Sequence, residues 1–300
     1  MRIKKLLTFE ADGYRRWGVL SADEQGVYSA DALEEAFFTP LTETLSEFIR
    51  QGNDSLSALA YALEQNEKTQ AVSPIPLNRI RIVSPLPENE RNIFCIGKNY
   101  PDHIAEFERT AKADIPAHPV IFTKAAAAVI GTEDTIQAHA SLTKELDYEG
   151  ELAVIIGKTG ADIPLAEAMD YVYGFTILND VTARDLQRRH SQWFHGKSLD
   201  TFCPMGPYIL LRDAAPDHFT IRTEVNGEIR QDASTSECIF SIPQLLHILS
   251  QGTTVHAGDV LATGTPAGVG IGFQPPKFLK AGDTVRITIS SIGTLTNTVR

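Results

Sequence analysis

The chain has 300 residues, of which 43% are hydrophobic and 22% are charged, the composition of an ordinary folded protein. Its 38 acidic residues outnumber its 27 basic residues and give a net charge of −11. This acidity excludes nucleic acid as an expected partner and disfavours anionic membrane surfaces, because both require clusters of lysine and arginine. An anionic substrate would need a local positive group that overcomes the repulsion.

Neither a signal peptide nor a membrane span is predicted. The basic start of the chain is followed at once by charged residues rather than by an apolar segment. No apolar run approaches the roughly 18–20 residues needed to cross a bilayer. The cysteines Cys95, Cys203 and Cys238 are too far apart to indicate a disulfide framework or a zinc site. We therefore expect a soluble cytoplasmic protein with no membrane partner.

The N-terminal segment is predicted to form a small α/β unit. Strands are expected at 4–9 and 16–20, joined by a turn at Asp12-Gly13. Helices are expected over 41–50, where apolar residues recur with helical spacing, and over 57–65.

A proline-rich connector follows this unit. The prolines of this segment are Pro74, Pro76, Pro85 and Pro87. Prolines at this density favour extended chain over packed helix. We therefore predict a domain boundary near residue 88, with a small N-terminal domain over 1–88 and a larger domain over 89–300.

The rest of the chain is rich in predicted strands. They are expected at 93–97, 120–123, 152–156, 172–178, 208–211, 221–225, 259–262, 285–290 and 295–299. Asn226-Gly227 predicts a hairpin turn, and capping-box patterns predict helices that begin at Thr182 and Ser241. The pattern indicates an α+β fold that is mainly β, with helices at its edges, rather than alternating βαβ units.

Three acidic residues at strand ends form the first candidate site. Glu149 and Glu151 are two residues apart, so on an extended chain they point to the same face. Asp180 ends another apolar strand. Carboxylates held together favour a divalent cation with oxygen ligands, such as magnesium, manganese or calcium. The alternative for the acidic pair is an ordinary solvated strand end.

A positive cluster follows Asp180. Arg184, Gln187 and Arg188 are three and four residues apart and share a helix face, and Lys197 lies a short distance beyond. In an acidic protein this cluster is a candidate anion-binding surface, although a solvated helix face would have the same spacing.

His103 and Glu106 form a third candidate. Pro101 suits the first turn of a helix, on which these two side chains would share a face. A carboxylate beside an imidazole orients it and raises its basicity, as a general base requires. An ordinary pair on a surface helix would show the same spacing.

The glycine-rich segment 263–272 is the fourth candidate. It does not fit a dinucleotide-binding loop, because prolines follow it where that motif needs a helix. Such a loop can still present backbone N–H groups and the Thr265 hydroxyl to a carboxylate.

Together these segments resemble the fumarylacetoacetate hydrolase family. The resemblance runs from about residue 92 to residue 299. The segments that carry it are IGKNY (96–100), LDYEGEL (146–152), NDVTARD (179–185), GKSLDTFCPMGP (196–207), VNGE (225–228), FSIP (240–243) and ATGTPAGVG (262–270). The N-terminal region and residues 275–278 are most similar to a bacillar subgroup associated with oxaloacetate decarboxylation.

The resemblance implies a mixed β-sandwich roll, a homodimer and a set of site residues. The implied ligands of Mg²⁺ or Mn²⁺ are Glu149, Glu151 and Asp180. The implied catalytic residues are His103 and Glu106, on a lid, together with Lys197. The implied substrate-binding residues are Arg184, Gln187 and Thr265. Lys124 is not carried over as a substrate-binding residue, because its block runs into four alanines where the family commonly has proline or serine.

These residues predict a metal-dependent enzyme that acts on a short 2-oxo acid, a small dicarboxylate or acylpyruvate. The metal and Lys197 would stabilise an enolate. Our first expectation is oxaloacetate decarboxylation. The alternatives are C–C hydrolysis of an acylpyruvate or fumarylpyruvate, isomerisation of 2-hydroxyhepta-2,4-diene-1,7-dioate, and oxaloacetate tautomerisation. A regulatory binding protein on the same fold is the non-enzymatic alternative.

Overall fold

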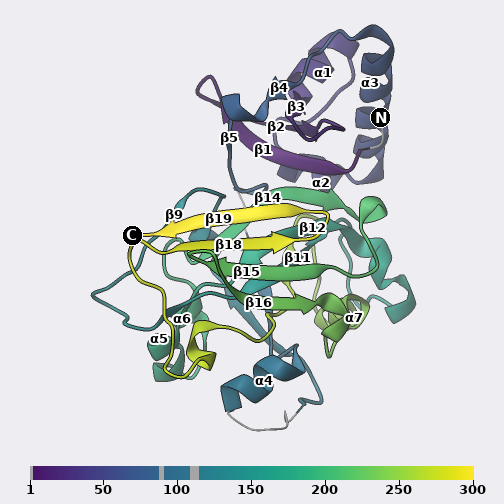
Figure 1. Cartoon of the computed structure of the whole chain (residues 1–300). Helices are drawn as coiled ribbons and strands as arrows, with labels where there is room; N and C mark the ends of the chain where they lie inside the picture. Colours follow the sequence, from purple (N-terminus) through teal and green to yellow (C-terminus); the bar gives the residue numbers. More distant parts are fainter. Residues whose placement is uncertain (1–2, 88–90, 109–114) are drawn as a thin grey trace.

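The computed structural model describes residues 3–87, 91–108 and 115–300 (Figure 1). The domain boundary predicted near residue 88 falls outside these described residues. Figure 1 places the N-terminal elements at one end of the molecule and the short helix α4 (Pro101–Glu108) at the opposite end.

The N-terminal region combines a small meander of strands with three helices. Its elements are β1 (Lys5–Ala11), β2 (Tyr14–Leu20), β3 (Gly26–Ser29), α1 (Ala30–Phe37), α2 (Leu45–Gln51), α3 (Asn53–Thr69), β4 (Ile75–Pro76), η1 (Leu77–Arg79) and β5 (Arg81–Ile82). The predicted turn between β1 and β2 is confirmed, with Asp12 and Gly13 both at positive φ. Of the two predicted helices, α2 begins after Thr44, whose side chain caps it, and α3 is longer than expected. Helix α1 was not predicted.

The main sheet continues from these strands into the rest of the chain. Its further strands are β6 (Ile93–Gly97), β7 (Val120–Lys124), β8 (Val129–Ile130), β11 (Gly150–Ile156), β12 (Val172–Asn179), β14 (Cys203–Leu211) and β17 (Val260–Ala262). The order along the sheet is β4-β3-β2-β1-β14-β12-β11-β17-β6-β7. Every residue of β11 and β12 is buried, as expected for near-continuous apolar strands covered on both faces.

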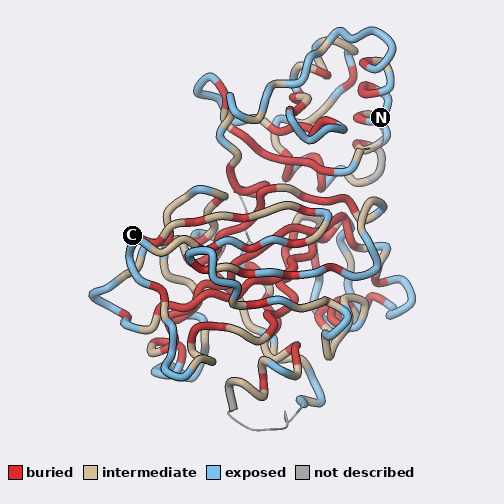
Figure 2. Tube along the Cα trace, in the orientation of Figure 1, coloured by how far each residue is buried: buried red, intermediate tan, exposed pale blue. Residues whose placement is uncertain are grey.

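A second sheet packs against the first. It has the order β16-β15-β18-β19-β9 and comprises β9 (Thr135–Ile136), β15 (Thr220–Val225), β16 (Glu228–Ser234), β18 (Thr284–Ile289) and β19 (Gly293–Val299). Buried residues alternate with more exposed residues along β15 and β18, so each strand turns one face inward. Leu152, Phe175, Ile221 and Ile287 belong to one apolar cluster that joins the sheets, and buried chain runs through both (Figure 2). The α+β, mainly β sandwich is therefore confirmed.

The remaining elements are short and lie around the sheets. They are η2 (Ala126–Ala128), β10 (Leu146–Asp147), η3 (Leu165–Tyr171), β13 (Thr182–Ala183), α5 (Arg184–Arg189), α6 (Phe194–Lys197), η4 (Arg212–Ala214), η5 (Thr235–Glu237), α7 (Ile242–Ser250) and η6 (Gly270–Gly272). The predicted start of α7 after Ser241 is confirmed. The prediction that Thr182 caps a helix is wrong, because Thr182 pairs in β13 and its hydroxyl donates to the Asp180 carbonyl.

Candidate functional site

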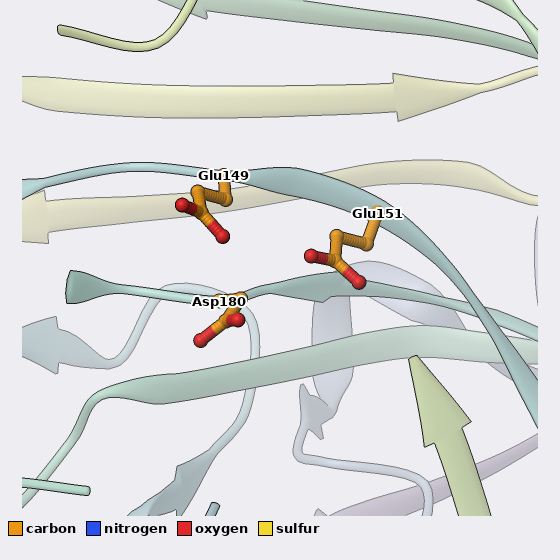
Figure 3. A group of neighbouring side chains, drawn as sticks. All are labelled: Glu149, Glu151 and Asp180. Atoms are coloured by element: carbon orange, nitrogen blue, oxygen red, sulfur yellow. The ribbon is translucent and has the colours of Figure 1, made fainter. Parts of the chain in front are cut away.

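The two central strands bring the three predicted acidic ligands together. Gly150 of β11 pairs with Asn179, the last residue of β12. This register brings Asp180, the next residue after β12, close to Glu149 and Glu151 on either side of Gly150. The Asp180 amide donates to the Glu149 carbonyl over 2.9 Å, which fixes this corner. One oxygen from each side chain lies within 4.8 Å of the others, and Figure 3 shows the three carboxylates converging.

Two cations contact these carboxylates from the positive cluster. The Lys197 Nζ lies 2.7 Å from both Glu149 Oε2 and Asp180 Oδ2. The Arg184 Nη1 lies 2.7 Å from Glu149 Oε1. Burial alone would raise the pKa of Glu149, but Lys197 and Arg184 hold it well below its usual range.

A third cation, Lys124, closes the far side of Asp180. Its Nζ lies 2.6 Å from Asp180 Oδ1 and also donates to the carbonyls of Val181 and Lys197. The Lys124 side chain is fully buried, and its contact supports Asp180.

The buried charges around this site do not balance without a cation. Among the residues that the structure describes, the four carboxylates of Asp147, Glu149, Glu151 and Asp180 lie with three buried cations, Lys124, Arg184 and Lys197, and all seven residues are at most 5% exposed. Burial, and then Asp180 and Glu149, raise the pKa of Glu151 well above its usual range. A divalent ion fits this oxygen-only donor set, and it would leave one positive charge for a substrate carboxylate.

A pocket opens beside the acidic residues. The predicted site residues that line it are His103, Glu149, Glu151, Arg184, Gln187, Lys197 and Thr265. Arg184 Nη1 also donates to Gln187 Oε1 over 3.3 Å, so these two side chains lie side by side. The Thr265 hydroxyl donates to the Gly150 carbonyl and accepts from Gln231, which fixes its orientation at the pocket wall.

His103 and Glu106 enter the site from α4. His103 Nδ1 lies 3.7 Å from Glu106 Oε2, and both side chains are largely buried. Glu106 in turn accepts from the Gly268 amide over 3.0 Å. The helix therefore contacts the glycine-rich loop, and the imidazole lines the same pocket as Glu149 and Glu151.

The glycine-rich loop presents its N–H groups to carboxylates, as expected. These carboxylates are side chains of the protein itself and not those of a ligand. Gly264 donates to Glu151, Gly268 to Glu106, and Gly270 and Ile271 to Asp147. At Gly272 a Cβ would lie only 1.5 Å from Glu106 Oε1, so only glycine permits this approach.

Several site residues were not predicted. Asp147 is two residues before Glu149, as Glu149 is two residues before Glu151. This spacing was the sequence feature that could have indicated Asp147. Phe122 and Trp193 form an apolar wall of the pocket with ring centroids 5.2 Å apart, and nothing in their local sequence pointed to it. Arg188 instead pairs with Glu145 at the surface, as the solvated alternative suggested.

No helix within the described residues is long and apolar enough to cross a membrane.

Comparison with known proteins gives concordant results. The family model described as fumarylacetoacetate (FAA) hydrolase C-terminal matches residues 92–300. A curated relative, oxaloacetate tautomerase YisK of Bacillus subtilis (strain 168), is 48% identical over 264 residues, 87% of this chain and 82% of the relative.

Two solved structures extend the likeness. A fumarylacetoacetate hydrolase from Exiguobacterium antarcticum is 42% identical with a TM-score of 0.83, covering 99% of each chain. Maleylpyruvate hydrolase from Sphingobium sp. SYK-6, solved with manganese(II) and pyruvate, is 28% identical with a TM-score of 0.76, covering 98% of each chain. The family model, the close relative and the buried acidic triad agree, and the chain belongs to the fumarylacetoacetate hydrolase family.

Proposed function

We propose that the protein is a Mg²⁺- or Mn²⁺-dependent tautomerase that interconverts the keto and enol forms of oxaloacetate. The observation that carries the proposal is the pocket that the His103 imidazole lines together with buried carboxylates paired with Lys197. An acid–base group and a fixed positive charge at one small pocket suit proton transfer beside a carbonyl. The relative named as an oxaloacetate tautomerase supports this choice.

The reaction needs one C–H bond broken and one O–H bond formed. A divalent ion held by Glu149, Glu151 and Asp180 would supply Lewis-acid polarisation of the 2-oxo group. Arg184 and Gln187 hold the substrate carboxylate. The His103 imidazole, oriented by Glu106, takes a proton from C3 and returns it to the C2 oxygen, and the Lys197 ammonium stabilises the negative charge that develops there.

Decarboxylation, our first expectation from the sequence, would pass through the same enolate. It differs in that the bond to C4 breaks and carbon dioxide leaves, so it does not need His103 to remove a proton. The named relative favours tautomerisation over decarboxylation. Hydrolysis of an acylpyruvate is the second candidate, because a similar solved protein is a maleylpyruvate hydrolase.

The decisive experiment follows oxaloacetate in two channels with Mn²⁺ present. Ultraviolet absorbance reports the enol, and a coupled dehydrogenase reports released pyruvate. We expect enol–keto exchange well above the metal-only rate and no comparable pyruvate release. The variants Glu149→Ala and Glu151→Ala should lose the exchange.

A matched control is Asp259→Asn, because Asp259 is also buried and pairs with an arginine, Arg91, at 2.6 Å, but does not line the pocket. Pyruvate release as fast as exchange would instead establish the decarboxylase, and exchange equal to the metal-only rate would reject the tautomerase. Maleylpyruvate and acetylpyruvate, assayed beside oxaloacetate, test the hydrolase. Light scattering tests the homodimer, which stays a prediction.

A further inference from the structure

Asp147 is the buried carboxylate of the site that the proposed reaction does not use. Its side chain is fully buried and accepts four donors. Oδ1 accepts the amides of Tyr148 and Gly270 over 2.9 and 2.7 Å. Oδ2 accepts Arg184 Nε and the Ile271 amide over 2.9 and 3.0 Å. Four donors saturate both oxygens, so this group is suited to hold other groups in place rather than to bind a metal or move a proton.

The first group that it holds is the substrate-binding arginine. Arg184 is 1% exposed. On one edge of its guanidinium, Nε donates to Asp147, and on the other edge Nη1 contacts Glu149 and Gln187. A planar guanidinium with both edges fixed has one orientation. Asp147 therefore helps to set where a substrate carboxylate meets Arg184.

The second group is the glycine-rich loop on which α4 rests. A Cβ at Gly270 would lie 2.5 Å from Asp147 Oδ1 and 2.6 Å from the Lys277 carbonyl, so the loop packs against Asp147 too closely for a side chain at position 270. Two residues earlier in the same loop, the Gly268 amide donates to Glu106 of α4. One short loop thus joins Asp147 to the acid of the His103–Glu106 pair.

We propose that Asp147 is a positioning residue that couples the docking of α4 to the placement of Arg184. The coupling path runs from Glu106 through Gly268–Ile271 to Asp147 and then to Arg184. Asp147 accordingly holds Arg184 and the loop that contacts α4 in fixed positions relative to each other. This inference rests on the proposed function only in its use of Arg184 as the carboxylate-binding group.

The test uses full-length Asp147→Asn. Asparagine keeps the shape but replaces one oxygen with an NH₂ group, which faces N–H donors that it cannot accept. Asp259→Asn is the control, because it also removes the charge of a buried aspartate that pairs with an arginine, in this case the partly exposed Arg91, away from the pocket. The first readout, which needs no ligand, is amide hydrogen exchange of residues 101–108 in α4. We expect faster exchange in Asp147→Asn and no change in Asp259→Asn.

The second readout is calorimetric binding of pyruvate to the Mn²⁺-loaded protein. A hydrogen bond to a charged group changes an equilibrium by about tenfold or more, and we expect pyruvate binding to weaken by about this factor while Mn²⁺ affinity stays within about threefold. Combined with Glu106→Ala, the effect on pyruvate binding should be less than the product of the two single effects.

Each result bears on one proposal. Unchanged α4 exchange in Asp147→Asn, or effects that multiply in the double variant, would overturn the coupling. Failure of the wild-type protein to turn over oxaloacetate or to bind pyruvate would reject the proposed function, and hydrogen exchange would still decide the role of Asp147.

Discussion

At the scale of single residues, the convergence of Glu149 and Glu151 follows from simple strand geometry, but the contact of Asp180 with Lys124 does not. Glu149 and Glu151 converge because strand side chains repeat every two residues, a local rule that the sequence displays. The contact of Lys124 with Asp180 spans 56 residues. Such a contact depends on the order of strands in the sheet, so no local pattern predicts it.

The proton-transfer role of His103 is a residue-scale prediction. His103→Gln removes the imidazole without changing the triad, which consists of Glu149 just before β11, Glu151 within it and Asp180 just after β12. Loss of a general acid–base group typically lowers the rate 10²–10⁴-fold, and we expect a fall of about this size in the rate constant for enol–keto exchange. Mn²⁺ affinity, measured by calorimetry, should be unchanged. Exchange at the wild-type rate would remove His103 from the reaction.

At the scale of elements, long strands were predictable and short pieces around the site were not. The apolar runs of β11 and β12 are recognisable as strands in the sequence, because strands buried on both faces have few polar residues. Helix α5 begins at Arg184 instead of Thr182, because pairing of β13 with β10 takes up Thr182. Tertiary pairing here overrides a local capping signal that is correct at α7.

The contact between α4 and the glycine-rich loop supports an element-scale prediction. In Gly272→Ala the new Cβ would collide with the Glu106 side chain, 1.5 Å from Oε1 and 2.0 Å from Cδ, so this side chain must leave its contacts with the Gly268 amide and His103. We expect kcat/KM for oxaloacetate to fall about tenfold or more while Mn²⁺ affinity is kept, since a small misplacement of a reacting group can cost about 10²-fold.

A matched variant is Gly252→Ala, where a Cβ meets nothing within 4 Å and the site is not involved. Its positive φ of 67° adds backbone strain, so any loss of kcat/KM that both variants share reports stability rather than lid docking. Equal kcat/KM in the two alanine variants would contradict the role of the loop as the seat of α4.

At the scale of the whole molecule, the N-terminal region is built into the main sheet. Strand β1 pairs with β14 through Lys5–Leu210 and Leu6–Ile209. A single apolar cluster contains Trp17 and Phe48 together with Ile155. The domain boundary expected near residue 88 stays a prediction, whereas the pairing of β1 with β14 joins distant segments and leaves no local trace in the sequence.

Removal of the N-terminal region should therefore weaken the whole protein. A fragment that starts at residue 91 would expose the edge of β14 and the apolar cluster beneath Trp17 and Phe48, and unpaired strand edges promote association. We expect a lower melting temperature and concentration-dependent aggregation, measured by calorimetry and light scattering. A monodisperse fragment with the melting temperature of the full chain would show that the region is dispensable for folding.

The negative charge of the molecule finally connects its stability to the metal. The buried charged residues of the site comprise four carboxylates and three cations. The raised pKa of Glu151 shows that this carboxyl group is the one most destabilised in its charged form. A carboxyl group with a raised folded-state pKa destabilises the fold as pH rises above its ordinary value, because the folded state resists losing the proton. At neutral pH the metal-free protein carries this penalty, and a bound divalent ion removes it.

Glu151→Gln tests this directly, because the amide oxygen can still accept the Gly264 N–H while the charge is gone. With chelator at neutral pH, this variant should melt above the chelated wild type, by roughly 2–4 °C for each kcal/mol recovered. Mn²⁺ at a hundredfold excess over its dissociation constant should stabilise the wild type by about 2.7 kcal/mol and the variant far less. If the chelated variant melts below the chelated wild type, the Glu151 charge stabilises the fold even without metal. The excess negative charge of the four buried carboxylates would then have to be offset elsewhere in the protein.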